Sequence, residues 1–313
     1  MTARLANCYD MRLFRKSKVC KAVHFIYEYA RRSRRSADYK RVYRCLAKRI
    51  GEFEKSRGIT VYSNTFTDSV AEDFIDFMKD RGLLVSTIKG YMAKIGFMFS
   101  KMAKRGYEVD WTFQDIILED EDPITVYITS EEIERIYEMN IKTKERELIR
   151  DMFVANCLIG MRFGDFKKLT NKNISGDTIV RRTNKTGAGV RVPVHRIVRD
   201  ILNKYNGFPP YEKSDQNYNK VVKNICKQAG LNDKVLWERT VGHNIVRKTY
   251  KRYELVGSHT ARRSFATNAY VSGIPVARIM LITGHKTESS FFKYIRIEKK
   301  ENAEVLADHP FFN

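Results

Sequence analysis

The forty residues 258–297 near the C-terminus contain His259, Arg262, His285 and Tyr294. His259 and Arg262 are three residues apart, so their side chains share one face if the segment is a helix. His285 follows a Thr-Gly pair, and Tyr294 comes nine residues after it. Arginine and histidine bind phosphate oxygens, and a tyrosine hydroxyl can form a covalent intermediate. These residue types predict phosphoryl-transfer chemistry with Tyr294 as the nucleophile.

The same segment permits a simpler interpretation. The chain contains 17 tyrosines, and a lone HxxR motif arises readily by chance. A helix, a TGH turn and a second basic helix also match an ordinary helix-turn-helix that reads the major groove of DNA. Residues outside this segment are needed to decide between the two.

Three upstream residues add to the chemistry. Arg162 follows an apolar helix and a glycine in GMRFGDF, and an arginine in apolar surroundings is costly unless it is paired. Its pairing with Asp165 is either a structural ion pair on one helix turn or a way to aim the guanidinium at a phosphate. Lys185 lies at the tip of an expected hairpin, TNKTG. It either aids solubility or gives a proton to a leaving oxygen.

The charge of the chain indicates a polyanionic partner. Lys and Arg total 58 against 37 Asp and Glu, a net charge of +21, and such an excess favours nucleic acid. No apolar run approaches the ~20 residues of a membrane span, and no secretion signal is present, so we expect a cytoplasmic protein without a membrane partner. Five widely spaced cysteines without a CxxC pair predict reduced thiols and no metal site.

Apolar spacing predicts four helices in the first third, over residues 20–35, 38–56, 69–82 and 85–106. Basic and polar side chains on the first and fourth are candidates for contact with the DNA backbone. From the arginine run alone, a solvated helix end is the simpler explanation of the four arginines, and the net charge of the chain favours DNA contact. The candidates are Arg31, Arg32, Arg34, Arg35, Thr87, Lys89, Tyr91 and Lys94.

Charge also divides the chain into domains. Residues 1–105 carry a balance of +14, whereas residues 106–135 hold one basic and ten acidic residues. We therefore expect an N-terminal helical domain over 1–106, an acidic linker over 107–128 and a second domain over 129–313. Alternating β-branched residues over 173–194 predict a small antiparallel sheet. Residues 231–257 fit either a strand or an irregular loop, with His243 in a structural role, and residues 288–297 are expected to form a helix carrying Tyr294.

In chain order, these motifs resemble the catalytic signature of the tyrosine recombinases of the phage integrase family. The resemblance is close over 129–300 and looser over 20–106. The segment ITGHKTESSFFKYI is similar in sequence to the branch of this family that is found in mobile elements and invertible DNA of Bacteroidetes. Phe291 departs from the many members that carry threonine there, at a position that is not catalytic. The matching residues are Arg162 with Asp165, Lys185, His259, Arg262, His285 and Tyr294.

The resemblance implies a mainly α-helical fold, with a helical core-binding domain and an α+β catalytic domain that carries a small antiparallel sheet. It implies site-specific recombination of duplex DNA, for integration, excision or inversion, through a 3′-phosphotyrosine bond and without a cofactor or metal. Arg162 and Arg262 are then expected to hold the phosphate oxygens. His259 and His285 handle protons, and Lys185 protonates the leaving 5′-oxygen.

The family also implies a homotetramer around two paired DNA sites, with the C-terminal residues 298–313 docking on a neighbour. The need for an accessory DNA-bending protein stays open. Two other functions remain at this stage. One is a regulator that binds DNA without cutting it, and the other is an enzyme like the type IB topoisomerases, which relaxes single duplexes.

Overall fold

A computed structural model describes residues 18–119, 121, 124–182, 189–211 and 214–295. Lys185 and the C-terminal residues 298–313 lie outside this part of the chain. The structure divides into two compact units. The first comprises residues 1–121 and 238–246, and the second comprises residues 122–237 and 247–313.

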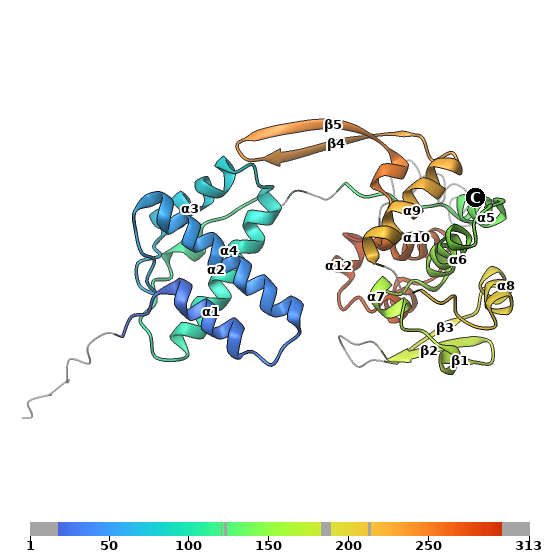
Figure 1. Cartoon of the computed structure of the whole chain (residues 1–313), viewed down its shortest axis with the longest axis horizontal. Coiled ribbons are helices and arrows are strands. Elements are labelled where there is room, and N and C mark those ends of the chain that lie inside the picture. The colour runs from blue at the N-terminus through green and yellow to red at the C-terminus, as the bar shows by residue number, and fades with distance from the viewer. Residues whose placement is uncertain (1–17, 120, 122–123, 183–188, 212–213, 296–313) are drawn as a thin grey trace, which may run out of the picture. The chain divides into compact units, whose positions relative to one another are not determined.

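The first unit is built from four helices, shown in blue to green in Figure 1. They are α1 (Ala22–Arg32), α2 (Ala37–Arg57), α3 (Asp68–Asp80) and α4 (Val85–Ala103). The side chain of Thr67 accepts the Val70 N–H at the start of α3, and Gly58 ends α2 in the left-handed conformation. These helices lie where the apolar spacing predicts them, because each has one face buried in a shared core. On α4 the fully buried positions are Ile88, Ile95, Met98, Phe99 and Met102.

The acidic segment after α4 differs from the expected linker. Residues 107–118, which include the short 3₁₀ helix η1 (Thr112–Asp115), pack against the core of the first unit. Phe113 is 3% exposed and stacks edge-on against Phe66 and Phe99. The negative charges of this segment concealed its apolar positions, so the first unit extends well beyond residue 106.

A two-stranded hairpin brings a distant part of the chain into the first unit. It consists of β4 (Lys234–Val241) and β5 (Asn244–Lys251), the ribbon at the top of Figure 1. At its tip, the Gly242 N–H donates to the Leu83 carbonyl over 2.9 Å, and Val241 pairs with Leu84. The Nε2 atom of His243 lies 3.1 Å from Asp80 Oδ1. The segment that the sequence left undecided is thus a hairpin.

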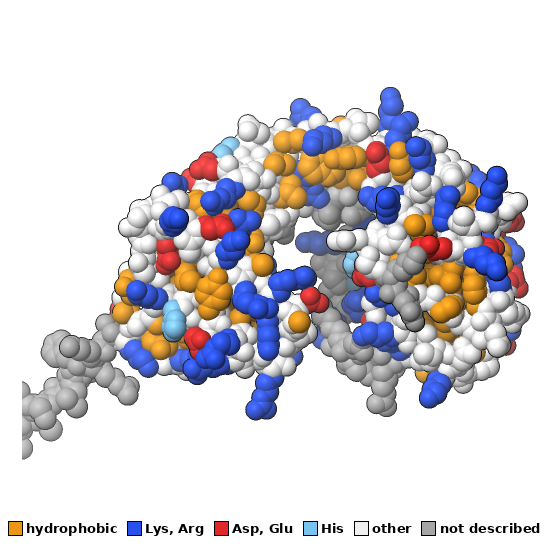
Figure 2. Space-filling view, in the orientation of Figure 1, with side chains coloured by type: hydrophobic (Ala, Val, Ile, Leu, Met, Phe, Trp, Pro, Cys, Tyr) orange, Lys and Arg blue, Asp and Glu red, His pale blue; other side chains and the backbone are white. Residues whose placement is uncertain are grey.

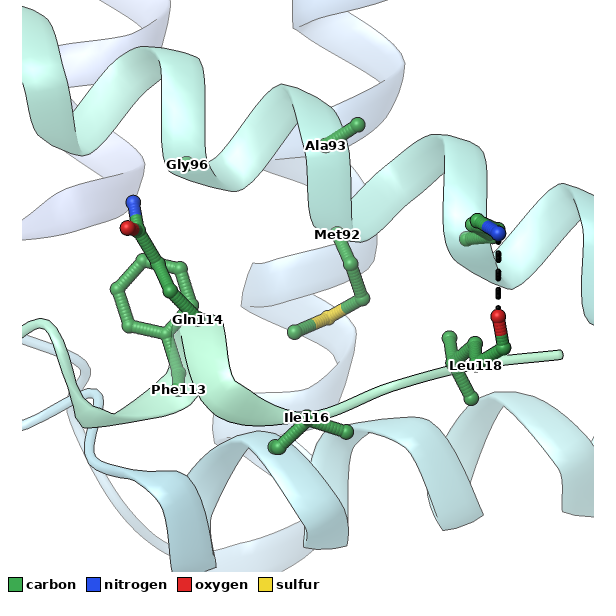
Figure 3. Close-up of a pocket in the computed structure, with 8 residues that line it drawn as sticks. Met92, Ala93, Gly96, Phe113, Gln114, Ile116 and Leu118 are labelled. Carbon is green, nitrogen blue, oxygen red and sulfur yellow. Dashed lines mark hydrogen bonds between the residues drawn. The ribbon is translucent and has the colours of Figure 1, made fainter.

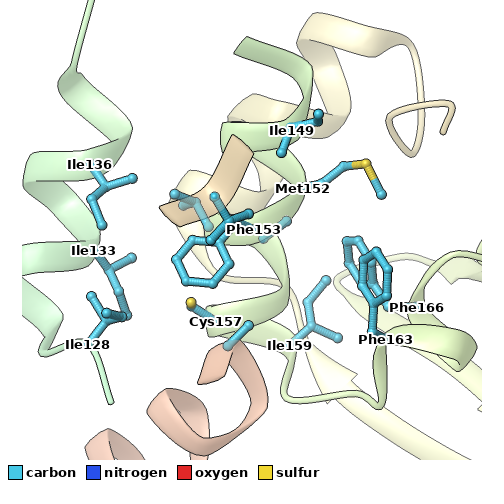
Figure 4. Packing of buried hydrophobic residues seen from close by; sticks show 14 of the residues in the cluster. Ile128, Ile133, Ile136, Ile149, Met152, Phe153, Cys157, Ile159, Phe163 and Phe166 are labelled. Carbon is cyan, nitrogen blue, oxygen red and sulfur yellow. The ribbon is translucent and has the colours of Figure 1, made fainter. Parts of the chain in front are cut away.

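The second unit is organised around α6 (Lys144–Ile159), which is buried along most of its length. It packs against α5 (Ser130–Glu138), α8 (Arg196–Tyr205), α9 (Asp215–Gln228) and α10 (Ser258–Val271). Figure 4 shows the apolar side chains that meet there, among them Ile133, Phe153 and Phe163. Thr129 caps α5 in a capping box with Glu132, which satisfies two backbone N–H groups at the helix start.

The predicted small antiparallel sheet is present in this unit. It has the order β1 (Ile174–Ser175), β2 (Thr178–Arg182) and β3 (Gly189–Pro193). Ile179 faces Val192 across β2 and β3, and both side chains are buried. One face of the sheet is therefore anchored to the core of the second unit.

The last helices of the described chain are α11 (Val276–Thr283) and α12 (Glu288–Phe292). The expected helix over 288–297 is shorter than predicted, because α12 ends at Phe292 and Tyr294 lies just beyond it. The Tyr294 N–H still donates to the Phe291 carbonyl over 2.8 Å. None of the helices that the structure describes has the length and apolar character to cross a membrane.

Candidate active site

Gly160 places the first arginine of the site. It ends α6 with a φ of 75°, and a Cβ atom on it would lie 2.3 Å from Cδ1 of Phe265. A left-handed turn this close to a ring requires glycine. The chain then turns through Arg162 into the short helix α7 (Phe163–Phe166). Arg162 and Asp165 line a narrow pocket of the second unit, together with Arg262 and Thr283.

The role expected for Asp165 differs in the structure. Its carboxylate lies 3.8 Å from the Nη2 atom of Arg181 on β2, and Arg181 also donates to the Asp165 carbonyl. The Asp165 N–H donates to the Arg162 carbonyl over 2.8 Å, but within the described ranges no hydrogen bond joins the two side chains. Asp165 therefore holds a third arginine at the pocket, instead of forming the expected contact with Arg162.

Arg262 is held by backbone carbonyls. It lies on α10 and is 4% exposed. Its Nη1 atom donates to the Gly160 carbonyl over 3.0 Å, and its Nη2 atom donates to the Thr283 carbonyl. The planar guanidinium offers donors in a fixed fork, so these two bonds fix its orientation. His259 lies one turn earlier on α10, and its side chain is exposed. The N-cap of this helix is Gly257.

His285 and Tyr294 come from the segments that follow α11 and α12. Their ring centroids lie 4.9 Å apart. The Nδ1 atom of His285 is 2.9 Å from the hydroxyl oxygen of Thr283. The Tyr294 hydroxyl donates to the His259 carbonyl over 3.4 Å. The Cζ atom of Arg262 lies 5.8 Å from the centre of the tyrosine ring.

The surroundings lower the pKa of three of these groups. Loss of hydration on burial lowers the pKa of Arg262 to about 10, which leaves the guanidinium charged at neutral pH. Burial, and then the charges of Arg262 and Arg162, lower the pKa of His285 to about 4. The pKa of His259 is lowered by the same kinds of cause, loss of hydration first. At neutral pH both imidazoles are thus uncharged and lie near the charged guanidinium of Arg262, an arrangement suited to binding an anion.

The structure brings together most of the predicted site. Arg162, Arg262, His285 and Tyr294 meet in the second unit, with His259 beside Tyr294, whereas Lys185 lies outside the described residues. The sequence did not indicate Arg181, Arg263 or Thr283. The one signal for Arg263 was its place in the arginine pair of HTARR, and the signal for Thr283 was its position in TGH. In the described part of the chain, no cluster of His, Cys, Asp and Glu could hold a metal ion.

The predicted DNA contacts of the first unit fall into two groups. Arg31 and Arg32 both bind the carboxylate of Glu28, with Arg31 making two bonds of 2.8 Å. The Arg31 hydrogen bond lowers the pKa of Glu28 to about 2. Arg34 and Arg35 are exposed and form no ion pair with any residue that the structure describes. Figure 2 shows Lys and Arg side chains over the visible surface of each unit.

On α4, Lys89 and Lys94 turn towards the protein. The Nζ atom of Lys89 donates to the Leu118 carbonyl over 3.1 Å, the dashed line in Figure 3. It borders an apolar pocket between α4 and the segment after η1, where Met92 faces Ile116. The Nζ atom of Lys94 donates to the Gly90 carbonyl over 2.7 Å. Each ammonium group therefore has a backbone acceptor within the protein.

Comparisons with known proteins agree on one fold. The model of the phage integrase family matches residues 126–301, more than half of the chain. The Tn1549 transposon integrase in complex with a circular intermediate DNA is similar with a TM-score of 0.66 and 15% identity, over 91% of this chain and 98% of that one. No curated protein sequence matches the chain.

Two further solved structures are similar. A lambda integrase dimer bound to a COC′ core site has a TM-score of 0.65 and 14% identity, over 89% of this chain and 98% of that one. The XerH site-specific recombinase bound to difH has a TM-score of 0.59 and 18% identity, over 92% of this chain and 85% of that one. At such identities, these structures show a shared fold.

Proposed function

The chain belongs to the phage integrase family and is a site-specific recombinase that breaks and rejoins DNA; we propose that Tyr294 is its nucleophile. The tyrosine oxygen attacks the scissile phosphate, a bond to phosphorus forms, and the bond to the 5′-oxygen breaks. The resulting 3′-phosphotyrosine retains the energy of the broken ester. The 5′-hydroxyl of a partner strand then attacks this bond and releases the tyrosine.

The other residues stabilise the charge of the phosphate. Arg162 and Arg262 hold its non-bridging oxygens, where donors fixed in advance are most effective. Arg262 is so fixed, because Gly160 and Thr283 hold its guanidinium. His259 and His285 take part in hydrogen bonding and proton transfer. Lys185, which lies outside the described residues, protonates the leaving 5′-oxygen.

One observation carries this assignment. The ring of Tyr294 lies 4.9 Å from that of His285 and 5.8 Å from the guanidinium carbon of Arg262, although the three residues come from separate segments. Among 17 tyrosines, this one lies beside two of the predicted phosphate ligands. The arrangement supports a tyrosine that acts on a bound phosphodiester.

Replacing Tyr294 with phenylalanine tests the nucleophile. On a nicked suicide substrate, Tyr294→Phe is expected to form no covalent protein–DNA adduct while binding DNA as the wild type does, because only the attacking oxygen is lost. Tyr270→Phe is the matched control, since Tyr270 packs against Phe292 in the same small cluster without taking part in the chemistry. Adducts formed by Tyr294→Phe would contradict the assignment.

The same substrates separate the remaining alternatives. A regulator without catalytic activity forms no adduct even as the wild type, and an enzyme like the type IB topoisomerases forms one without exchanging strands between two sites.

We propose strand exchange between paired duplex sites by a homotetramer acting on bacterial DNA at the nucleoid, with integration, excision or inversion as the outcome. A promoter between inverted repeats beside the coding sequence would indicate inversion.

A further inference from the structure

The pocket of the second unit gathers three arginines around one carboxylate. Arg162 follows α6, Arg181 lies on β2 and Arg262 lies on α10. Among the described residues that line the pocket, Asp165 of α7 has the only carboxylate. Like charges this close repel one another, and a buried carboxylate stabilises the cation that it faces. The partner that Asp165 takes therefore decides which arginine stays free for another anion.

In the structure, the partner of Asp165 is Arg181. The carboxylate is 9% exposed and lies 3.8 Å from the Nη2 atom of Arg181, which also donates to the Asp165 carbonyl. Arg262 is bound to the Gly160 and Thr283 carbonyls. By contrast, the guanidinium of Arg162 forms no hydrogen bond or ion pair with any residue in the described part of the chain.

Without Arg181, the carboxylate would have Arg162 as its nearest alternative on the same turn. The two residues are three positions apart, and the Asp165 N–H donates to the Arg162 carbonyl over 2.8 Å. Side chains at this spacing are within reach of each other. A buried carboxylate without a partner is costly, so loss of Arg181 favours an Asp165–Arg162 ion pair. A guanidinium held in that way has fewer donors and less charge to offer a phosphate.

We propose that Arg181 is a positioning residue that occupies the Asp165 carboxylate and thereby leaves Arg162 free to bind the scissile phosphate. The role of Arg162 in this proposal rests on the function proposed above. Arg181 itself makes no contact with the phosphate and takes part in no bond that forms or breaks. It acts only through the partner that it gives to Asp165.

A second-site change tests this competition. Arg181→Met keeps an apolar stem of similar length and removes the guanidinium. It is expected to slow single-turnover adduct formation on the nicked substrate by roughly ten- to a hundredfold, approaching the loss of one donor to the transition state. Adding Asp165→Asn is expected to restore most of the rate, because a neutral amide does not hold Arg162 by charge. If Arg181 were only structural, changing its partner as well would not restore the rate.

Nuclear magnetic resonance gives a second readout without DNA. In the full chain labelled with ¹⁵N-arginine, each side-chain Nε–H gives a signal, and Arg162→Lys assigns that of Arg162. Exchange of this proton with water is expected to slow several-fold in Arg181→Met, because the carboxylate then binds the Arg162 guanidinium. It is expected to return to the wild-type rate in the double variant Arg181→Met/Asp165→Asn.

The matched control removes an arginine–aspartate pair outside the pocket. Arg199 and Asp177 form an exposed ion pair of 2.8 Å in the same unit. The double variant Arg199→Met/Asp177→Asn is expected to change neither the adduct rate nor the Arg162 signal. Arg181→Lys is expected to retain most of the rate, because an ammonium group still neutralises the carboxylate.

Two results would overturn the proposal. One is a double variant Arg181→Met/Asp165→Asn that forms adducts no faster than Arg181→Met, which would assign Arg181 a direct contact with DNA or a purely structural role. The other is an unchanged exchange rate of the Arg162 proton in Arg181→Met, which would show that the carboxylate does not turn to Arg162. The spectra need no DNA, so they stand even if Tyr294→Phe disproves the nucleophile.

Discussion

Two consecutive arginines of α10 have different tasks in the second unit. Arg262 turns into the pocket and donates to the Gly160 and Thr283 carbonyls. Arg263 points elsewhere on the helix, with Nε 3.2 Å from the Tyr294 carbonyl and Nη1 3.3 Å from the Val126 carbonyl. Neighbouring residues on a helix do not share a face. In the proposed mechanism, one arginine is therefore available to the phosphate, while the other holds the backbone of Tyr294, the proposed nucleophile.

Removing the second arginine tests this difference. Arg263→Ala is expected to slow adduct formation by roughly ten- to a hundredfold at saturating DNA, because a small displacement of a reacting group can cost that much. The rate of Arg263→Lys should fall between the rates of the wild type and of Arg263→Ala, since an ammonium group lacks the planar fork that spans both carbonyls. Single-turnover assays on the nicked substrate measure the rate, and DNA affinity measured in parallel separates positioning from binding. An unchanged rate constant with weakened binding would show that Arg263 contacts DNA instead.

Single residues were predictable where their chemistry is rare and their spacing regular. His259, Arg262, His285 and Tyr294 stood out because each belongs to a short motif. The roles of Thr283 and Arg263 were not predictable, because they depend on bonds to backbone carbonyls that lie far away in sequence. The pairing of Asp165 with Arg181 was missed for the same reason, since β2 had to be placed against α7 first.

At the scale of elements, burial on one face made the four helices of the first unit predictable. The hairpin of β4 and β5 was not, because it is largely exposed and its polarity shows no clear alternation. Its tip is fixed by residues about 160 positions earlier, where His243 meets Asp80 and Gly242 meets Leu83. A contact over that distance leaves no local pattern in the sequence.

At the tip of the hairpin, Gly242 is the residue whose substitution is least tolerated. Its φ is 63°, and a Cβ atom would lie 2.6 Å from the backbone oxygen of Lys79. Gly242→Ala is therefore expected to detach the tip, with faster amide hydrogen exchange over residues 238–246. Gly176→Ala is the matched control, because Gly176 also has a positive φ, of 55°, in a strand turn, but no atom lies within 4 Å of the added carbon.

The two glycine variants separate strain from collision. Both substitutions pay the cost of a left-handed alanine, of the order of 1 kcal/mol, whereas only Gly242→Ala also meets a backbone atom that cannot move aside. If amide hydrogen exchange over residues 238–246 stays at the wild-type rate in Gly242→Ala, the close contact of Gly242 with the Lys79 backbone does not hold the hairpin tip.

At the scale of the whole molecule, positive charge is shared between the two ends of the sequence. Residues 1–105 carry +14 and residues 136–313 carry +16, separated by the acidic stretch. Charge of this kind binds DNA by displacing counterions, irrespective of its sequence. The basic side chains differ in their surroundings, since Arg31 and Arg32 share the single negative charge of Glu28. Net charge alone therefore does not show which arginines contact phosphate.

Salt dependence distinguishes arginines that contact phosphate from those that only contribute charge. Each lost contact lowers the slope of log affinity against log salt concentration by about 0.9 on duplex DNA. The double variant Arg34→Ala/Arg35→Ala is thus expected to lower the slope by about 1.8, because these side chains are exposed and form no ion pair within the described residues. Arg31→Ala/Arg32→Ala removes the same charge but should lower the slope by no more than about 0.9, since Glu28 binds both side chains and balances one of the two charges. Fluorescence anisotropy on labelled duplex across a salt series measures the slope of each variant. Equal slopes in the two variants would show that the two pairs of arginines do not differ in phosphate contact.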